Sequence, residues 1–138
     1  MIMSKKTSAA PVGCPCGLPA SYENCCGRYI DPPQQPAPTA EALMRSRYVA
    51  YTRQQEAYLL ATWHASTRPA ALDLAQDPVK WLGLQVVRCQ DGQINHTQGV
   101  VQFVARYKVN GRACRLQETS RFVREEGHWY YLDGDIAD

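Results

Sequence analysis

The chain has 138 residues, 45% of them apolar and 20% charged, which is typical of one globular domain and excludes an intrinsically disordered segment. The formal net charge of +2 is too small to indicate a nucleic-acid or membrane partner. Basic residues gather between positions 106 and 124, where we expect a solvated strand face and no nucleic-acid site.

Residues 1–12 are expected to be a flexible N-terminus. They contain two lysines but no apolar stretch of signal-peptide length, and no apolar run approaches the ~20 residues of a membrane span. We therefore expect a cytoplasmic protein whose thiols stay reduced.

Four cysteines lie close together in residues 13–30: Cys14, Cys16, Cys25 and Cys26. In a reducing compartment such a cluster indicates a metal site, and bridging Cys14 to Cys16 or Cys25 to Cys26 would strain the chain. Four thiolates fill the tetrahedral coordination of Zn²⁺, which predicts a structural zinc ion. Cross-linked or reactive thiols are the alternatives. Cys89 and Cys114, far downstream, are expected to be buried reduced thiols.

Residues 31–38, DPPQQPAP, hold four prolines. This composition favours polyproline II and predicts a semi-rigid linker between the cysteine motif and the rest of the chain. The alternative is an ordered strap docked across the larger domain.

A helical pattern follows the linker. Thr39 is the expected N-cap of a first helix, because apolar residues recur at helical spacing over 40–51. A second helix is expected over about 54–63. Pro69 is expected to open a third helix that ends near Asp77-Pro78.

From Trp81 onward the sequence is strand-like. Asp91-Gly92 and Asn110-Gly111 are strong signals of two-residue hairpin turns, and Glu126-Gly127 is a weaker one. These turns predict four antiparallel strands, at about 81–90, 94–109, 112–124 and 129–135. Helices followed by a meander predict an α+β fold in which N-terminal helices pack on a curved four-stranded sheet.

The Asn110-Gly111 turn also predicts a register. It pairs Val101 with Ser120 and places Glu118 on the same face, whose apolar content marks it as the inner one. An unpaired carboxylate there is costly, so Arg47 on the apolar face of the first helix is the expected partner of Glu118.

The outer hairpins extend this inner face. The Asp91-Gly92 turn would place Leu82 beside Val101, and Arg124 opposite Trp129 would turn Asp133 inward, whereas a slip of one residue would turn it outward. The polar groups expected at a pocket on this face are Arg47, Tyr48, His64, Glu118, Ser120 and Asp133. A buried structural ion pair and a packed histidine are the alternatives to ligand binding.

The cysteine spacing, Cys-x-Cys, eight residues and Cys-Cys, resembles the SEC-C motif, best known from the tail of the SecA translocase motor, where the zinc-bound module contacts partner macromolecules. With ENCCGRY, LMRSRYVAY, WLGLQV, VQFVARY and WYYLDG in the same chain, the sequence resembles the YchJ-like family. The resemblance implies a zinc motif followed by a cone-shaped domain of the nuclear transport factor 2-like (NTF2-like) class, here residues 39–138.

Two functions are expected from these features. In the first, the zinc motif docks to a protein or a ribosome-associated partner without enzymatic activity, and a motif that only caps the larger domain is the alternative. In the second, the cone holds a small-molecule site, with an isomerase- or dehydratase-like activity by analogy with other domains of its class. A binding module is favoured over an enzyme.

Overall fold

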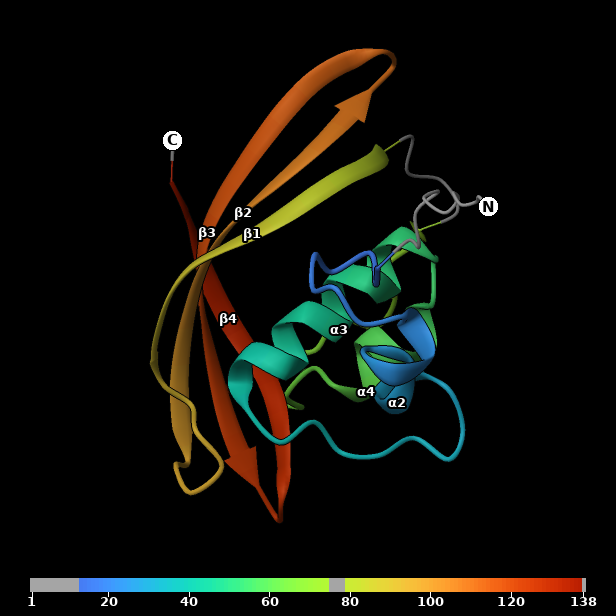
Figure 1. Cartoon of the computed structure of the whole chain (residues 1–138). Helices are drawn as coiled ribbons and strands as arrows, with labels where there is room; N and C mark the ends of the chain where they lie inside the picture. The colour runs from blue at the N-terminus through green and yellow to red at the C-terminus, as the bar shows by residue number, and fades with distance from the viewer. Residues whose placement is uncertain (1–12, 75–78, 138) are drawn as a thin grey trace, which may run out of the picture.

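A computed structural model describes residues 13–74 and 79–137, so the N-terminus that was expected to be flexible lies outside the described residues. Four strands form one antiparallel sheet in the order β1-β2-β3-β4, with bounds Val79–Asp91, Gln98–Val109, Arg112–Glu125 and His128–Ala137. The sheet is curved, and the helices lie on its concave side (Figure 1). The expected α+β architecture is confirmed.

The principal helix is α3 (Ala40–Thr52), followed by the short α4 (Glu56–Ala61). Thr39 caps α3, because its Oγ1 accepts a hydrogen bond from the N–H of Ala42 at 3.1 Å. Gln54 has a φ of 55°, which interrupts the helical path, so α4 begins later than the sequence pattern predicts. None of the described helices is long and apolar enough to cross a membrane.

The third helix predicted from Pro69 is wrong over residues 69–73, which are not helical. The N–H of Leu72 donates to Glu56 Oε2 at 3.3 Å, which ties this segment to α4, and Asp73 has a φ of 54° that a helix cannot contain. The predicted end of this helix, near Asp77-Pro78, lies outside the described residues.

Two of the three predicted turns are tight hairpin turns. Asn110-Gly111 and Glu126-Gly127 have positive φ at both residues, as two-residue hairpin loops of this kind require. The first of these turns sets the predicted register of β2 and β3, in which Val101 lies opposite Ser120.

The predicted two-residue turn at Asp91-Gly92 is wrong, because a longer loop joins β1 to β2. The loop spans residues 92–97, and the N–H of Gly92 at its start donates to the carbonyl of Gln98 at 3.0 Å. Val101 consequently lies opposite Cys89. Leu82 falls at a bulge in β1 and is exposed.

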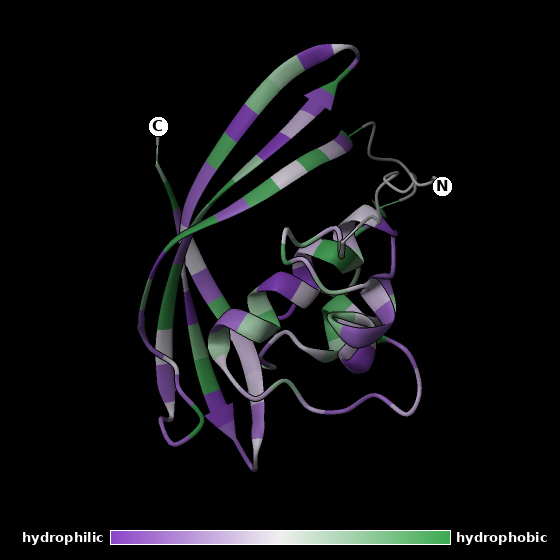
Figure 2. Cartoon of the chain, viewed as in Figure 1, coloured by the Kyte–Doolittle hydropathy of each residue, from purple (hydrophilic) through white to green (hydrophobic). Residues whose placement is uncertain are grey.

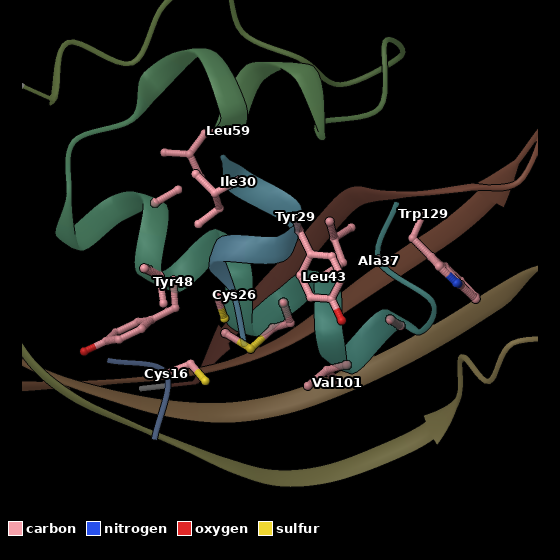
Figure 3. Packing of buried hydrophobic residues seen from close by; sticks show 14 of the residues in the cluster. Cys16, Cys26, Tyr29, Ile30, Ala37, Leu43, Tyr48, Leu59, Val101 and Trp129 are labelled. Atoms are coloured by element: carbon pink, nitrogen blue, oxygen red, sulfur yellow. The ribbon is translucent and has the colours of Figure 1, made fainter. Parts of the chain in front are cut away.

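The core lies between the inner face of the sheet and the helices. Hydrophobic and hydrophilic residues alternate along the strands, which is typical of a sheet with one buried face (Figure 2). Leu43 of α3 and Val101 of β2 belong to one buried cluster, and this cluster also contains Cys16 and Cys26 (Figure 3). The cysteine motif is therefore part of the main core.

Candidate functional site

Two short turns build the cysteine cluster. Gly17, with a φ of 100°, donates its N–H to the carbonyl of Cys14 at 3.0 Å and closes the turn that presents Cys14 and Cys16. The 3₁₀ turn η1 (Tyr22–Asn24) and the short helix α2 (Gly27–Ile30) flank Cys25 and Cys26. All four thiols are buried, and their sulfur atoms lie within 4.8 Å of one another.

The thiols of this cluster differ in acidity. A hydrogen bond with Cys26 lowers the pKa of Cys16 to about 5, and the same hydrogen bond raises the pKa of Cys26. Burial raises the pKa of Cys25 to about 11. The hydrogen bonds within the cluster therefore favour negative charge at Cys16 over Cys25 and Cys26. A bound cation is required to ionise all of them together.

The sulfur positions fit a metal ion. Four sulfurs around one tetrahedral ion, with bonds of ~2.3 Å, lie about 3.8 Å from one another. The sulfurs of Cys16 and Cys25 are 3.7 Å apart. Because four protein ligands leave no coordination position for water or substrate, an ion held here would have a structural role.

The cysteine motif packs on α3. Arg45 of α3 donates from a terminal guanidinium nitrogen to the carbonyl of Cys16 at 2.8 Å, and Glu41 holds the same guanidinium at 2.9 Å. The guanidinium of Arg53 lies over the ring of Tyr22, 4.2 Å from its centroid. The motif is thus joined to the helix that also lines the pocket described below.

The proline-rich segment 31–38 crosses the larger domain as an ordered strap. Ala37 is buried, and the carbonyl of Pro38 accepts from the indole N–H of Trp129 at 3.2 Å. The N–H of Gln35 donates to the carbonyl of Arg28 at 2.9 Å. These contacts match the docked strap that was the alternative to a free spacer.

A pocket of about 260 Å³ lies between α3 and the inner face of the sheet. Its apolar walls are Met44, Trp63, Trp81, Phe103, Leu116 and Phe122. Four of the six polar residues expected at such a pocket line it, namely Arg47, Tyr48, Glu118 and Ser120. An apolar pocket with a few polar groups is the usual form of a small-molecule site.

Arg47 is the buried cation of this pocket, with 5% of its surface exposed. One terminal nitrogen donates to the carbonyl of Leu59 and to Thr62 Oγ1, at 2.7 Å each. The guanidinium faces the rings of Trp63 and Tyr131, with centroids at 5.0 and 4.7 Å. Burial lowers the pKa of the Arg47 guanidinium, because water is replaced by a less polar environment.

The expected ion pair between Arg47 and Glu118 is not among the ion pairs of the described residues. Glu118 Oε2 accepts instead from Ser120 Oγ at 2.7 Å and from the hydroxyl of Tyr131 at 3.2 Å. Burial raises the pKa of Tyr131, and the negative charge of the neighbouring Glu118 raises it further. This hydroxyl therefore stays protonated. Arg47 donates to the carbonyl of Leu59 near the C-terminus of α4, where the helix dipole favours a cation.

His64 lies outside the pocket, contrary to the sequence prediction. The chain after α4 runs beside β4, where Trp63 bridges to Tyr131 and the N–H of His64 donates to the carbonyl of Tyr131 at 2.8 Å. In an extended chain successive side chains point to opposite sides, so Trp63 enters the pocket and His64 turns away. The imidazole Nε2 lies 2.9 Å from Glu125 Oε2.

The prediction that Asp133 points inward is also wrong. Arg124 lies opposite Trp129 as predicted, but the register shifts further along, where Phe122 pairs with Tyr131 and Arg121 with Asp133. Leu132 is the extra residue of this β-bulge. Asp133 therefore forms an ion pair with Arg121 and does not line the pocket.

The set of polar groups expected at the pocket left out several aromatic residues that line it: Tyr51, Trp63, Trp81 and Tyr131. Tyr51 follows Arg47 by four residues, a spacing that places both on one helix face and could have indicated it. No local signal could have indicated Trp63, because its position depends on the pairing of residues 62–64 with β4. Cys89 is exposed and Cys114 half-buried, so the expectation of two buried thiols is wrong.

Two solved structures of SEC-C motif containing proteins have a fold similar to this one. A SEC-C motif containing protein from Rhodopseudomonas palustris is 29% identical, with a TM-score of 0.80 over 92% of this chain and 100% of the other. One from Psychrobacter arcticus is 27% identical, with a TM-score of 0.72 over 91% of this chain and 82% of the other.

The domain described as "YchJ, middle NTF2-like domain" matches residues 39–134. A UPF0225 protein of Chromobacterium violaceum is 56% identical over 96% of this chain and 99% of its own length. A UPF0225 protein of Bordetella pertussis is 53% identical over 96% of this chain and 98% of its own length. The chain therefore belongs to the YchJ-like family, UPF0225, which confirms the resemblance read from the sequence.

Proposed function

We propose that this protein binds a small organic molecule in the pocket between α3 and the sheet, and that a structural zinc ion holds the cysteine motif against this cone. The pocket carries the proposal. It has about 260 Å³ of space, apolar aromatic walls and a buried Arg47 for which the described residues offer no carboxylate within 4 Å. A protein rarely keeps a buried cation in an apolar cavity unless a partner compensates it.

The proposal is tested by ligand-observed NMR with a fragment library. Ala105 lines the pocket and is buried, so Ala105→Leu should fill part of the cavity, whereas the matched Ala113→Leu adds the same side chain at an exposed position of β3. We expect fragments that bind the wild type and Ala113→Leu, and weaker binding to Ala105→Leu. Equal binding to all three proteins, or no binding fragment, would contradict the proposal. Far-UV circular dichroism checks that both variants fold.

Zinc is the metal that four thiolates in a tetrahedron suit best. The short N-terminal motif has too little apolar surface to fold alone, so an ion would contribute directly to its folding. We expect one zinc per chain by plasma mass spectrometry of protein purified under reducing conditions, and its loss in a Cys25→Ser, Cys26→Ser variant. Metal-free wild-type protein with the motif still ordered would overturn the zinc assignment.

Docking of the cysteine motif to a protein or ribosome-associated partner is the second candidate. Its support is the exposed loop Gly17–Ala20, where Leu18 is 39% exposed. Because the motif packs on α3, a partner would bind the motif as part of the whole molecule and not as a tethered module. Co-sedimentation with ribosomes should then be reduced by Leu18→Glu. Equal recovery of the wild type and this variant would count against the candidate.

A further inference from the structure

We propose that the pocket selects a small aromatic carboxylate, held by the guanidinium of Arg47 and packed against the ring of Trp63. This inference rests on the proposed function and names its ligand class. A buried guanidinium with free donors and an aromatic cavity with room for about one ring carry it.

The guanidinium of Arg47 has hydrogen-bond donors without an acceptor among the described residues. One terminal nitrogen donates to Leu59 and Thr62, and the hydroxyl of Tyr51 is a further, weaker hydrogen-bond partner of the guanidinium, which leaves other donors free. Its other close neighbours are the faces of Trp63 and Tyr131, which attract a cation but accept no strong hydrogen bond. An oxyanion is the partner that a planar guanidinium binds through two parallel hydrogen bonds.

Trp63 is part of the aromatic wall beside Arg47. Its indole Nε1 is buried and has no hydrogen-bond acceptor within the described part of the chain, although Trp63 lines the pocket. A buried donor without an acceptor costs free energy, and an indole nitrogen can only donate. Because Nε1 is closed off from the cavity as well as from bulk water, a ligand carboxylate would bind Arg47, and the Trp63 ring would pack against the ligand.

The walls and the volume define the rest of the ligand. Trp63, Trp81, Phe103 and Phe122 line the cavity, so a flat ring would pack against aromatic surfaces. The volume of about 260 Å³ is below the ~300–1,000 Å³ of sites for drug-sized ligands. A single aromatic ring with one carboxylate matches both properties.

Glu118 is the group that opposes an anion in this pocket. Ser120 and Tyr131 hold its Oε2, and its side chain lies against Gly134, where an added Cβ would collide with the carboxylate. β4 thus keeps Glu118 in a fixed position. The proposal consequently predicts opposite effects for the two charged residues: loss of Arg47 weakens anion binding, and loss of the Glu118 charge strengthens it.

The first experiment uses three probes of matched shape and different charge: benzoate, benzamide and benzylammonium. The indole N–H signal of Trp63 is followed by two-dimensional NMR during each titration of the full-length protein. We expect benzoate to shift this signal and to bind about tenfold more tightly than benzamide, as for a hydrogen bond to a charged group, with benzylammonium weakest. No variant is required, so a folding defect cannot mimic the result.

The second experiment repeats the benzoate titration on Arg47→Met and Glu118→Gln. We expect about tenfold weaker binding to the first and tighter binding to the second, while benzamide binding changes little in either. Arg47→Lys keeps the charge but loses the planar donor pair, so we expect an intermediate affinity. Tighter benzoate binding to Arg47→Met, or weaker binding to Glu118→Gln, would overturn the proposal.

The two proposals fail differently. If benzamide or benzylammonium binds as tightly as benzoate, or if fragments of other classes bind in the pocket while benzoate does not, the carboxylate assignment is wrong and the binding function stands. If no probe or library fragment binds in the pocket, the binding function is wrong as well.

Discussion

Single residues decide the chemistry of the pocket. Arg47 and Glu118 line the same cavity but form hydrogen bonds with different partners. Arg47 donates to a backbone carbonyl of α4, and Glu118 accepts from the hydroxyls of Ser120 and Tyr131. The sequence register placed Glu118 and Ser120 on the inner face correctly, because side-chain alternation follows directly from the Asn110-Gly111 turn. It could not predict which acceptor Arg47 would choose, since a long flexible side chain reaches several carbonyls and carboxylates.

A double-mutant cycle tests the contact between Glu118 and Gly134. A methyl group at Gly134 would displace the Glu118 carboxylate from Ser120 and Tyr131, so we expect Gly134→Ala to lower the free energy of unfolding by about 1–3 kcal/mol. In a Glu118→Ala background the same change should cost much less, because the space is then free. Urea unfolding of the four proteins measures both values. An equal loss in the two backgrounds would show that the two residues are not coupled.

At the scale of elements, α3 joins the two candidate sites. Arg45 on this helix contacts the cysteine motif, and Arg47 and Tyr48 line the pocket. The N-cap residue Thr39 and the helical periodicity after it were sufficient to predict α3. The turn signals were sufficient to predict the four strands. The bulges at Leu82 and Leu132 were not predictable, because they arise from how paired strands accommodate curvature. The Leu132 bulge alone turned Asp133 out of the pocket.

The N-cap of α3 gives a prediction at this scale. Thr39→Ala removes the side-chain acceptor for the N–H of Ala42, so we expect a loss of about 1 kcal/mol in the free energy of unfolding. Thr39→Ser retains the hydroxyl and should stay close to the wild type. Urea titrations followed by circular dichroism compare the three proteins. Indistinguishable midpoints for Thr39→Ala and the wild type would mean that the cap does not stabilise α3.

At the scale of the molecule, the cysteine motif and the cone share one core. The sequence suggested two parts separated by a spacer, but the four buried cysteines belong to the same cluster as Leu43 and Val101, and the strap is docked. The motif therefore fits the role of a cap on the larger domain better than that of a tethered module. Disordering the motif would therefore remove packing from α3.

We therefore expect Cys25→Ser, Cys26→Ser to lower the melting temperature of the whole chain, and not only to disorder residues 13–30. The matched control is Cys89→Ser, Cys114→Ser, which changes two thiols outside the cluster and should melt with the wild type. Differential scanning calorimetry measures the transitions, and amide exchange of β2 and β3 reports on the sheet. A cone that melts unchanged without the cluster would show that the two parts are independent.

Local patterns in the sequence were enough to predict the clustered thiols, the main helix, the four strands and the register of the central hairpin. Each depends on spacing, periodicity or turn chemistry within a few residues. Tertiary structure decided the rest: the partner of Arg47, the entry of Trp63 into the pocket, the outward turn of Asp133 and the docking of the strap. These depend on contacts between distant segments, where several arrangements satisfy the same local rules and only the packing of the whole chain selects one.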